Sequence, residues 1–369
     1  MPDIAMDRSY LQVWRTAQSA SLRSVIATWR RLRLITALLI FALGGGLLSA
    51  CGSSGSGAAS ITLYNGQHQQ TTDALVSGFE KATGINVKVR NGDEATLVDE
   101  VVTEGSHSPA DLIYTENSPA LEYLQGKGLL LAVNHSTLAQ TPSQYNSPLG
   151  DWVGSSARTS VLIYNPSLIS ESQLPSTILQ LESSAFRGKL ALAPGETDFQ
   201  PIVTSFVRTY GQSAAVAWLE GIKANAGDHV YPDNETVVND VNRGLADFGV
   251  IDQYYYYRMA AEIGAGAVHS KIAFFAPQDP GYVVDVSGAG ILKSSTHQAE
   301  AQRFLAYLTS RAGQEIIAHS TSFEYPIASG VATAEPEMPF DQLQPNGITI
   351  EQLGDGSTAI SLIKEVGLL

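Results

Sequence analysis

The sequence predicts an α/β protein with two lobes, each built from a sheet flanked by helices. The chain has 369 residues, of which 44% are hydrophobic, and this is enough to fill two cores. Short runs of β-branched and apolar residues alternate with longer segments of helical period, the pattern of α/β proteins. We expect the chain to cross between the lobes near Val161 and again near Val283.

The first lobe is expected to open with strands and helices in alternation. Gly84 ends the first helix, and Ser118 with Pro119 is suited to cap the third. The strands are predicted at Ile61–Tyr64, Ile85–Val89 and Asp111–Tyr114, and the helices at Thr72–Ala82, Ala95–Thr103 and Ala120–Gly128.

A loop-rich segment, residues 133–157, precedes the remaining elements. Asn234 is suited to be a helix N-cap, and Asp252 begins a helix that carries four consecutive tyrosines. The later strands are predicted at Val161–Tyr164, Lys189–Leu192, Ala246–Ile251 and Val283–Leu292, and the helices at Val203–Tyr210, Ala214–Ala224, Glu235–Gly244, Gln253–Gly264, Gln298–Leu308, Gly313–His319 and Ser357–Lys364.

Charge is distributed unevenly along the chain, whose formal net charge is −14. Residues 1–50 hold six arginines and two acids, so residues 51–369 hold 16 bases against 34 acids. A pI near 4.9 argues against a broad basic surface and therefore against nucleic acid as a partner. The single cysteine excludes a disulfide scaffold and a zinc site built on several cysteines.

The first 50 residues have the layout of a secretory signal peptide. Arginines precede an uncharged run, Leu34–Leu48, which contains three glycines and falls short of the ~20 residues that span a bilayer. The run leads into Leu-Ser-Ala-Cys, which is similar to a bacterial lipobox and implies that Cys51 becomes the lipidated first residue. The Gly/Ser-rich segment 51–60 is expected to be a flexible tether, leaving the body at the outer face of a membrane.

Polar side chains follow three of the predicted strands. His68 comes after the first strand, Glu116 after the third, and Tyr254 and Tyr255 after a later one. In open α/β sheets, ligands bind at the carboxyl ends of the strands. Helical period turns four consecutive tyrosines in different directions, so the first pair faces the region beyond the strand ends. Each residue alone is an ordinary loop or core residue, whereas together they indicate a binding site.

One imidazole, one carboxylate and two phenols form a hard donor set dominated by oxygen. Soft metals prefer thiolate or thioether, whereas calcium and magnesium prefer carboxylate, carbonyl and water. A phenol is a poor ligand until it loses its proton, and its ordinary pKa is about 10. A small trivalent cation can displace that proton at neutral pH, and Fe(III) is the one that is common in biology.

Several spaced segments resemble the bacterial ferric-ion-binding proteins of iron ABC importers, from about residue 61 to the C-terminus. The segments are Ile61–His68, Ala110–Glu116, Tyr254–Arg258, Gln278–Gly281 and Tyr325–Pro326. The resemblance implies a type II periplasmic-binding-protein fold, two α/β lobes joined by a hinge of crossing strands. It also implies a monomeric, non-enzymatic lipoprotein that captures Fe(III) between the lobes and delivers it to a permease and its ATPase.

The same resemblance implies the residues of the site. His68 and Glu116 match the ligands of the first lobe, and Tyr254 and Tyr255 match the tyrosine pair of the second. In the family an exogenous anion, phosphate or carbonate, completes the coordination. Asn234 matches a position that contacts this anion, and helix N-termini attract anions.

The loop formed by residues 194–199 matches the anion loop of the family but departs from it in charge. Thr197 is of the small neutral kind usual there, whereas Glu196 and Asp198 are acidic. Asp252 stands where the family often has asparagine, and these three carboxylates would repel a phosphate unless they turn away or bind protons. Whether one of them replaces the anion as a ligand stays open.

Two further positions belong to the surroundings of the predicted site. Asn117 stands where the family often has glutamine. Arg158 is expected either to contact the anion or to be a structural arginine on the hinge side.

The predicted domain boundaries follow from the leader and the two crossings. They are 1–50 for the signal peptide, 51–60 for the lipidated cysteine and tether, 61–158 for lobe 1, 159–283 for lobe 2, 284–337 for the return to lobe 1, and 338–369 for a C-terminal helical segment on lobe 2.

Two other functions remain open at this point. One is a receptor of the same fold for a polyamine, thiamine or an oxyanion. Such sites use aromatic sandwiches or backbone donors, and here the tyrosines could stack on a cationic ligand. The other is a tethered metalloenzyme, which is disfavoured because the sequence has no G-x-S-x-G, H-E-x-x-H or P-loop motif.

Overall fold

The computed structural model describes residues 59–333 and 337–369. The predicted signal peptide, Cys51 and most of the tether lie outside these residues. Within them, no helix combines the length and the apolar character that crossing a membrane requires.

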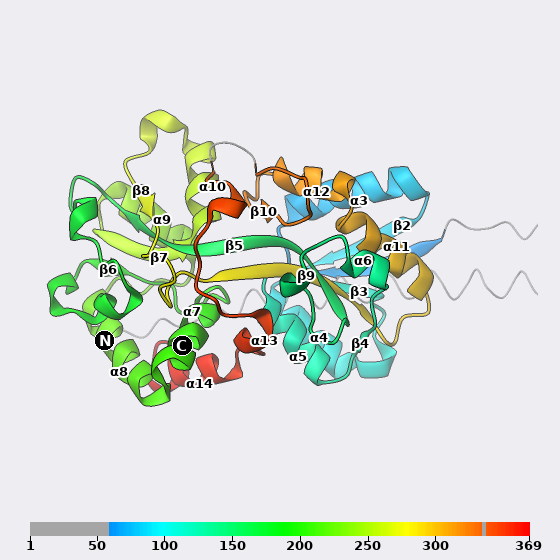
Figure 1. The fold of residues 1–369 in the computed structure, drawn as a ribbon, viewed down its shortest axis with the longest axis horizontal. Coiled ribbons are helices and arrows are strands. Elements are labelled where there is room, and N and C mark those ends of the chain that lie inside the picture. Colours follow the sequence, from blue (N-terminus) through cyan, green and yellow to red (C-terminus); the bar gives the residue numbers. More distant parts are fainter. Residues whose placement is uncertain (1–58, 334–336) are drawn as a thin grey trace, which may run out of the picture. The chain divides into compact units, whose positions relative to one another are not determined.

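A mixed sheet in the order β2-β1-β3-β9-β5-β7-β6 runs through the whole body (Figure 1). β1 is parallel to β2 and β3, β6 is parallel to β7, and the other neighbours are antiparallel. Short strands β4, β8 and β10 pair with β9 or β5 beside this path. The strands are β1 (Ser60–Asn65), β2 (Asn86–Asn91), β3 (Leu112–Thr115), β4 (Leu130–Leu131), β5 (Trp152–Tyr164), β6 (Leu190–Ala191), β7 (Phe248–Asp252), β8 (Lys271–Ala273), β9 (Val284–Leu292) and β10 (Tyr325–Pro326).

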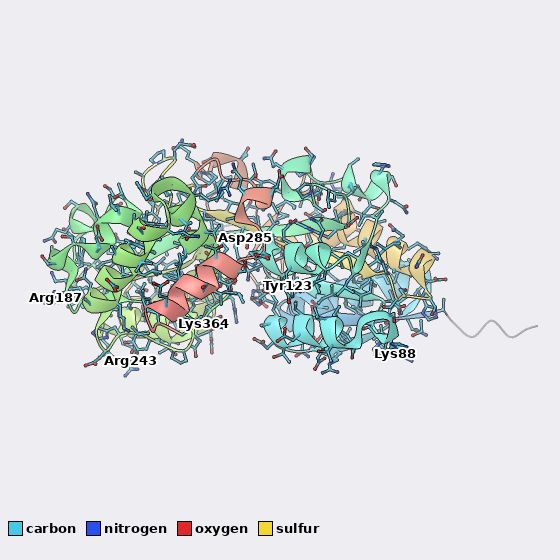
Figure 2. All side chains as sticks on the ribbon, turned by 90° about the horizontal axis from the view of Figure 1, so that it is seen from below. Lys88, Tyr123, Arg187, Arg243, Asp285 and Lys364 are labelled. Carbon is cyan, nitrogen blue, oxygen red and sulfur yellow. The ribbon has the colours of Figure 1, made fainter. Side chains whose placement is uncertain are left out.

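Two long strands, β5 and β9, join the two halves of the body. β5 pairs with β9 as far as Thr159, and from Ser160 onward it pairs with β7 of the other half. Every residue of both strands is buried. Asp285, on β9, lies where the two halves meet (Figure 2). The change of partner agrees with a crossing between two lobes at this point, while the exact lobe boundaries stay a prediction.

Helices cover the sheet and bury an apolar face against it. In the half that begins the chain they are α3 (Gln69–Thr83), α4 (Glu94–Glu104), α5 (Ser118–Gly126), α6 (His135–Leu138), α11 (Gln298–Leu308) and α12 (Arg311–Ala318). In the other half they are α7 (Phe199–Tyr210), α8 (Gln212–Ala226), α9 (Asn234–Arg243) and α10 (Gln253–Ile263), and the chain ends with α13 (Ile350–Leu353) and α14 (Ser357–Glu365). α14 contacts α7 and α8, and α13 contacts α5 and α7.

The predicted elements are found, but several of their ends were wrong. The loop predicted at 133–157 contains the first half of β5, because pairing with β9 and β10 extends a Gly- and Ser-rich segment that has little strand propensity of its own. Asp233 and not Asn234 caps α9, since its carboxylate accepts from the Thr236 amide at 2.7 Å. Likewise Asn117, and not Ser118, occupies the N-cap position of α5.

Candidate functional site

His68 and Glu116 form an ion pair at the ends of β1 and β3. His68 occupies the N-cap position of α3, and its Nδ1 lies 3.0 Å from Glu116 Oε1. Burial opposes protonation of His68, but the neighbouring carboxylate outweighs it and raises the pKa of the imidazole. Burial likewise opposes ionisation of Glu116, and the positive imidazole overcomes this and lowers the pKa of the carboxyl. The second imidazole nitrogen, Nε2, is buried and has no hydrogen-bond partner.

Tyr254 and Tyr255 lie in the first turn of α10, directly after β7. Their rings stack with centroids 4.1 Å apart, and both are buried, whereas Tyr256 and Tyr257 are half-buried. The helical period predicted that the first two tyrosines would face a different environment from the two that follow. Burial, and next the Asp198 carboxylate, hold the pKa of both phenols well above the ordinary value.

The two pairs meet in one cluster, in which both phenols are buried and His68 and Glu116 are half-buried. The rings of His68 and Tyr254 lie edge to face with centroids 5.1 Å apart. The strand ends of the two halves therefore bring an imidazole, a carboxylate and two phenols together.

Asp198 is the centre of the polar contacts around the phenols. Its Oδ2 accepts hydrogen bonds from Tyr254 Oη at 3.2 Å, Tyr255 Oη at 2.9 Å and Asn234 Nδ2 at 3.5 Å. Its other oxygen, Oδ1, is buried without a partner. Burial raises the pKa of this carboxyl, and the Arg158 guanidinium opposes that rise. A carboxylate of the protein itself therefore contacts both phenol oxygens.

The other residues predicted for the anion loop and its surroundings lie around the same cluster. Asn117 donates to Thr197 Oγ1 at 2.8 Å and so joins the two halves. Asp252 is buried beside the cluster, and burial together with Asp198 raises its pKa well above the ordinary range. Burial and the Asp198 carboxylate raise the pKa of Glu196 to about 8. Because several carboxyls lie close together, ionising all of them in the metal-free site is unfavourable. A multivalent cation would neutralise the carboxylates, so the site favours such an ion.

Arg158 lies fully buried at the point where β5 changes partner. It forms an ion pair with Glu324, donates to Ser287 Oγ at 3.0 Å and donates to Asn117 Oδ1 at 3.2 Å. Its guanidinium lies 5.5 Å from the ring centroid of Tyr254. Arg158 therefore has a structural role on the hinge side. Its positive charge also lies over the ring of Tyr254.

Five helices begin at the cluster, which adds to its electrostatic character. A helix N-terminus carries roughly half a positive charge, so it stabilises anionic groups that lie next to it. These N-termini favour the carboxylate and phenolate forms that a trivalent cation needs as ligands. The N-cap residues are His68 for α3, Asn117 for α5, Asp198 for α7, Asp233 for α9 and Asp252 for α10.

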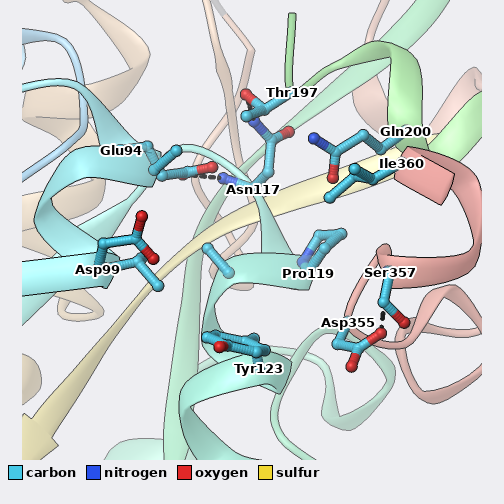
Figure 3. Close-up of a pocket in the computed structure, with 13 residues that line it drawn as sticks. Glu94, Asp99, Asn117, Pro119, Tyr123, Thr197, Gln200, Asp355, Ser357 and Ile360 are labelled. Atoms are coloured by element: carbon cyan, nitrogen blue, oxygen red, sulfur yellow. Dashed lines mark hydrogen bonds between the residues drawn. The ribbon is translucent and has the colours of Figure 1, made fainter. Parts of the chain in front are cut away.

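A cavity lined by Asn117 and Thr197, among other residues, lies in this half-to-half region (Figure 3). It has a volume of about 210 Å³ and a mainly apolar lining that includes Tyr123, with carboxylates from Glu94 and Asp355. Glu94 accepts from the Asn117 amide at 2.9 Å, and burial raises its pKa to about 8. This cavity holds neither the imidazole nor the phenol pair, so we do not assign the metal to it.

Among the described residues, no group of three or more His, Cys, Asp or Glu side chains is placed to hold a metal ion. The candidate centre therefore depends on its two phenols. Phenolate is a hard ligand that calcium and magnesium have no reason to recruit. The donor set fits Fe(III), which the protein would carry as cargo.

Sequence reasoning missed three polar residues that support the cluster. Glu324 binds Arg158, Gln67 precedes His68, and Gln253 precedes Tyr254. None of them belongs to a motif with a recognisable spacing. Only their positions next to predicted ligands could have drawn attention to the two glutamines.

Glu337 is a buried acid whose replacement should alter the pH dependence of stability. Gln253 Nε2 donates to its Oε2 at 3.4 Å, and burial raises its pKa to about 8. A raised pKa means that stability is full below the ordinary pKa and is lost as the pH rises through about 8. We expect Glu337→Gln to match the wild type at pH ~5 and to exceed it by on the order of 2 kcal/mol at pH ~9. Denaturant unfolding of the iron-free protein at both pH values is the measurement, and equal stabilities at the alkaline pH would contradict the expectation.

Comparison with known proteins places the chain among transport receptors. Residues 65–315 match the family model described as bacterial extracellular solute-binding protein. The chain is 37% identical over 340 residues to the Fe(3+)-binding periplasmic protein of Serratia marcescens, covering 92% of this chain and all of that one. The chain belongs to the bacterial extracellular solute-binding protein family.

Solved structures agree with this assignment. Iron-bound HitA from Pseudomonas aeruginosa is 39% identical to this solute-binding protein and superposes with a TM-score of 0.79, covering 84% of this chain and 99% of HitA. FutA of Trichodesmium, solved in complex with iron and citrate ligands, is 29% identical with a TM-score of 0.76, covering 84% of this chain and all of the other. These matches confirm the predicted type II periplasmic-binding-protein fold and the predicted resemblance to ferric-ion-binding proteins.

Proposed function

We propose that this solute-binding protein captures Fe(III) between its two lobes, with His68, Glu116, Tyr254 and Tyr255 as protein ligands. The observation that carries the proposal is that these four residues, from opposite halves, meet in one cluster. The unpartnered His68 Nε2 supports it, because a buried polar atom without a partner needs an explanation and coordination of an ion provides one. The names of the ferric-iron-binding relatives point to the same cargo.

Asp198 is the fifth ligand in this proposal and takes the place of the exogenous anion. Its Oδ2 already contacts both phenols, and its Oδ1 is buried and unpartnered. When Fe(III) displaces the phenol protons, the same carboxylate is free to turn toward the ion. His68, Glu116 and Asp198 are not yet grouped around one point in the metal-free protein, so the proposal requires these side chains to move together when the ion binds. Phosphate or carbonate is therefore a secondary partner of the site and not a requirement for binding.

Ligands from both lobes make closure depend on the ion. An ion held only by His68 and Glu116 is incompletely coordinated, and closure adds the two phenolates and Asp198. Because the metal binds the closed arrangement better, it shifts the population toward closure. A permease can then distinguish the loaded receptor from the empty one by the angle between the lobes.

The proposal also includes the location of the protein and its partners in transport. After the signal peptide is removed, lipidated Cys51 anchors a monomer to the outer face of the cytoplasmic membrane. There it passes iron to the permease and ATPase of an ABC importer and catalyses no reaction. Relatives named as periplasmic binding and iron uptake proteins support this setting.

A polyamine or thiamine receptor is a poorer match to the geometry. Such a ligand would stack its cation on the tyrosine faces. Those rings already face the guanidinium of Arg258, at 5.8 Å for Tyr254 and 5.9 Å for Tyr255, and that of Arg158. The aromatic faces are therefore occupied by the protein's own cations.

Titration with Fe(III) tests the proposed function directly. The colourless protein should gain a visible phenolate-to-iron charge-transfer band at one equivalent. At a free ion concentration 1,000 times the Kd, the stability gain is about 4 kcal/mol, which should raise the Tm by roughly 10 °C. Ga(III), a hard trivalent ion without d–d or charge-transfer colour, should raise the Tm and leave the solution colourless. A Tm that rises with a polyamine or thiamine but not with Fe(III) would overturn the proposal.

A further inference from the structure

The short segment between α12 and β10 contains the backbone feature that departs most from its residue type. Phe323 has a φ of +57°, in the left-handed region that bulky side chains rarely adopt. Such residues persist where the surrounding contacts hold them, and they gather at functional sites. Figure 1 shows that β10, which follows directly, lies between α10 and α12.

Glu324 ties this segment to the half that carries His68. Its carboxylate is 1% exposed and accepts from Gln67 Nε2 at 3.0 Å. It also accepts from Ser156 Oγ at 2.8 Å and forms the ion pair with Arg158. Gln67 in turn accepts from the His68 amide through its Oε1 at 2.6 Å. The carboxylate therefore holds the residue that precedes the first iron ligand.

Phe323 ties the same segment to the half that carries the tyrosines. Its carbonyl accepts from Gln253 Nε2 at 3.0 Å, and its ring stacks on Tyr257 with centroids 6.0 Å apart. Gln253 Oε1 accepts from the Thr159 amide of β5 at 2.8 Å. The carbonyl therefore holds the residue that precedes Tyr254, at the start of α10.

We propose that Phe323 and Glu324 form a clasp that positions the two halves of the iron site against each other. Two adjacent residues hold the two glutamines that precede a ligand in each lobe. The left-handed backbone at Phe323 lets its carbonyl face α10 while the side chain of Glu324 reaches Gln67, which precedes α3. The inference rests on the proposed function, because it assigns these residues to keeping the closed, iron-loaded arrangement and not to folding alone.

The test compares how fast Fe(III) leaves the loaded full-length protein for an excess of EDTA. Phe323→Val disfavours the left-handed backbone, so iron should leave about tenfold faster or more. Phe323→Asn tolerates that backbone and loses only the ring, so its acceleration should be smaller. In both variants the wavelength of the charge-transfer band should match the wild type, because no ligand has changed.

Two more variants keep the test decisive. Glu324→Gln weakens the contacts of the clasp with Gln67 and Arg158 and should also speed the release of iron. This variant tests the proposal if Phe323→Val does not fold. Phe304→Leu, in the apolar core formed with Phe79, lowers the Tm without touching the clasp and should release iron at the wild-type rate. Wild-type release rates in Phe323→Val and Glu324→Gln, or equal acceleration in Phe304→Leu, would overturn the clasp. A wild-type protein that gains no band with Fe(III) would instead overturn the proposed function.

Discussion

The variant Tyr254→Phe/Tyr255→Phe is expected to remain colourless with Fe(III) and to bind it at least about 10⁴-fold more weakly, a loss of roughly 5.5 kcal/mol. The visible band arises from electron transfer from phenolate to iron, so removing both oxygens removes it entirely. The loss of affinity is large because two of the five proposed protein ligands disappear. The stacked rings remain, since phenylalanine keeps the shape that packs in this buried cluster.

The neighbouring pair supplies a matched control for this experiment. Tyr256 and Tyr257 lie on the same helix but are only half-buried, and neither contacts Asp198. Tyr256→Phe/Tyr257→Phe should therefore keep both the colour and the affinity. Colour that persists in Tyr254→Phe/Tyr255→Phe would rule out the phenolate assignment.

Replacing Asp198 is expected to make iron binding depend on an added anion. In buffer free of phosphate and carbonate, Asp198→Ala should bind Fe(III) about 100-fold more weakly than the wild type, since a buried charged ligand contributes on the order of 3 kcal/mol. The truncated side chain leaves a space between both phenols and Asn234. Phosphate or carbonate should enter that space and restore most of the affinity.

Competition titration with a chelator, with and without about 10 equivalents of phosphate, measures the affinity for Fe(III) in each case. Asp228→Asn removes an equal charge from an exposed position and should bind iron as the wild type does in both buffers. If the wild type itself requires phosphate, Asp198 is not the fifth ligand. If Asp198→Ala binds as tightly as the wild type without any anion, the carboxylate serves only to hold the phenols.

The candidate ligands could be predicted because each follows a local pattern. Strand ends can be read from runs of apolar residues, and the helical period separates Tyr254 and Tyr255 from the two tyrosines that follow. Glu324 could not be predicted in this way. It lies 257 residues from Gln67 along the chain, and only the packing of β10 on β5 brings the two side chains together.

Three acids around the predicted anion position show that the site itself could not be predicted completely either. Sequence comparison with the family identified Glu196, Asp198 and Asp252 as unusual, but it left open which of them faces the phenols. The answer depends on where α7 begins and how it packs, and the sequence placed that start four residues too late, at Val203 instead of Phe199. Asp198 reaches both phenol oxygens because it occupies the N-cap of a helix that starts at the cluster.

The sequence by itself determined the two-lobed α/β pattern, the basic leader before an acidic body and the types of donor that suit a hard trivalent ion. These are properties of short segments, since local hydrogen bonding and the period of apolar residues encode them. Tertiary structure alone decided that β5 would be a 13-residue strand shared by both halves, and that Arg158 would pair with Glu324 beneath the phenols. The extent of β5 and the partner of Arg158 both depend on which segments far apart in the chain pack together. Short stretches of sequence do not contain that information.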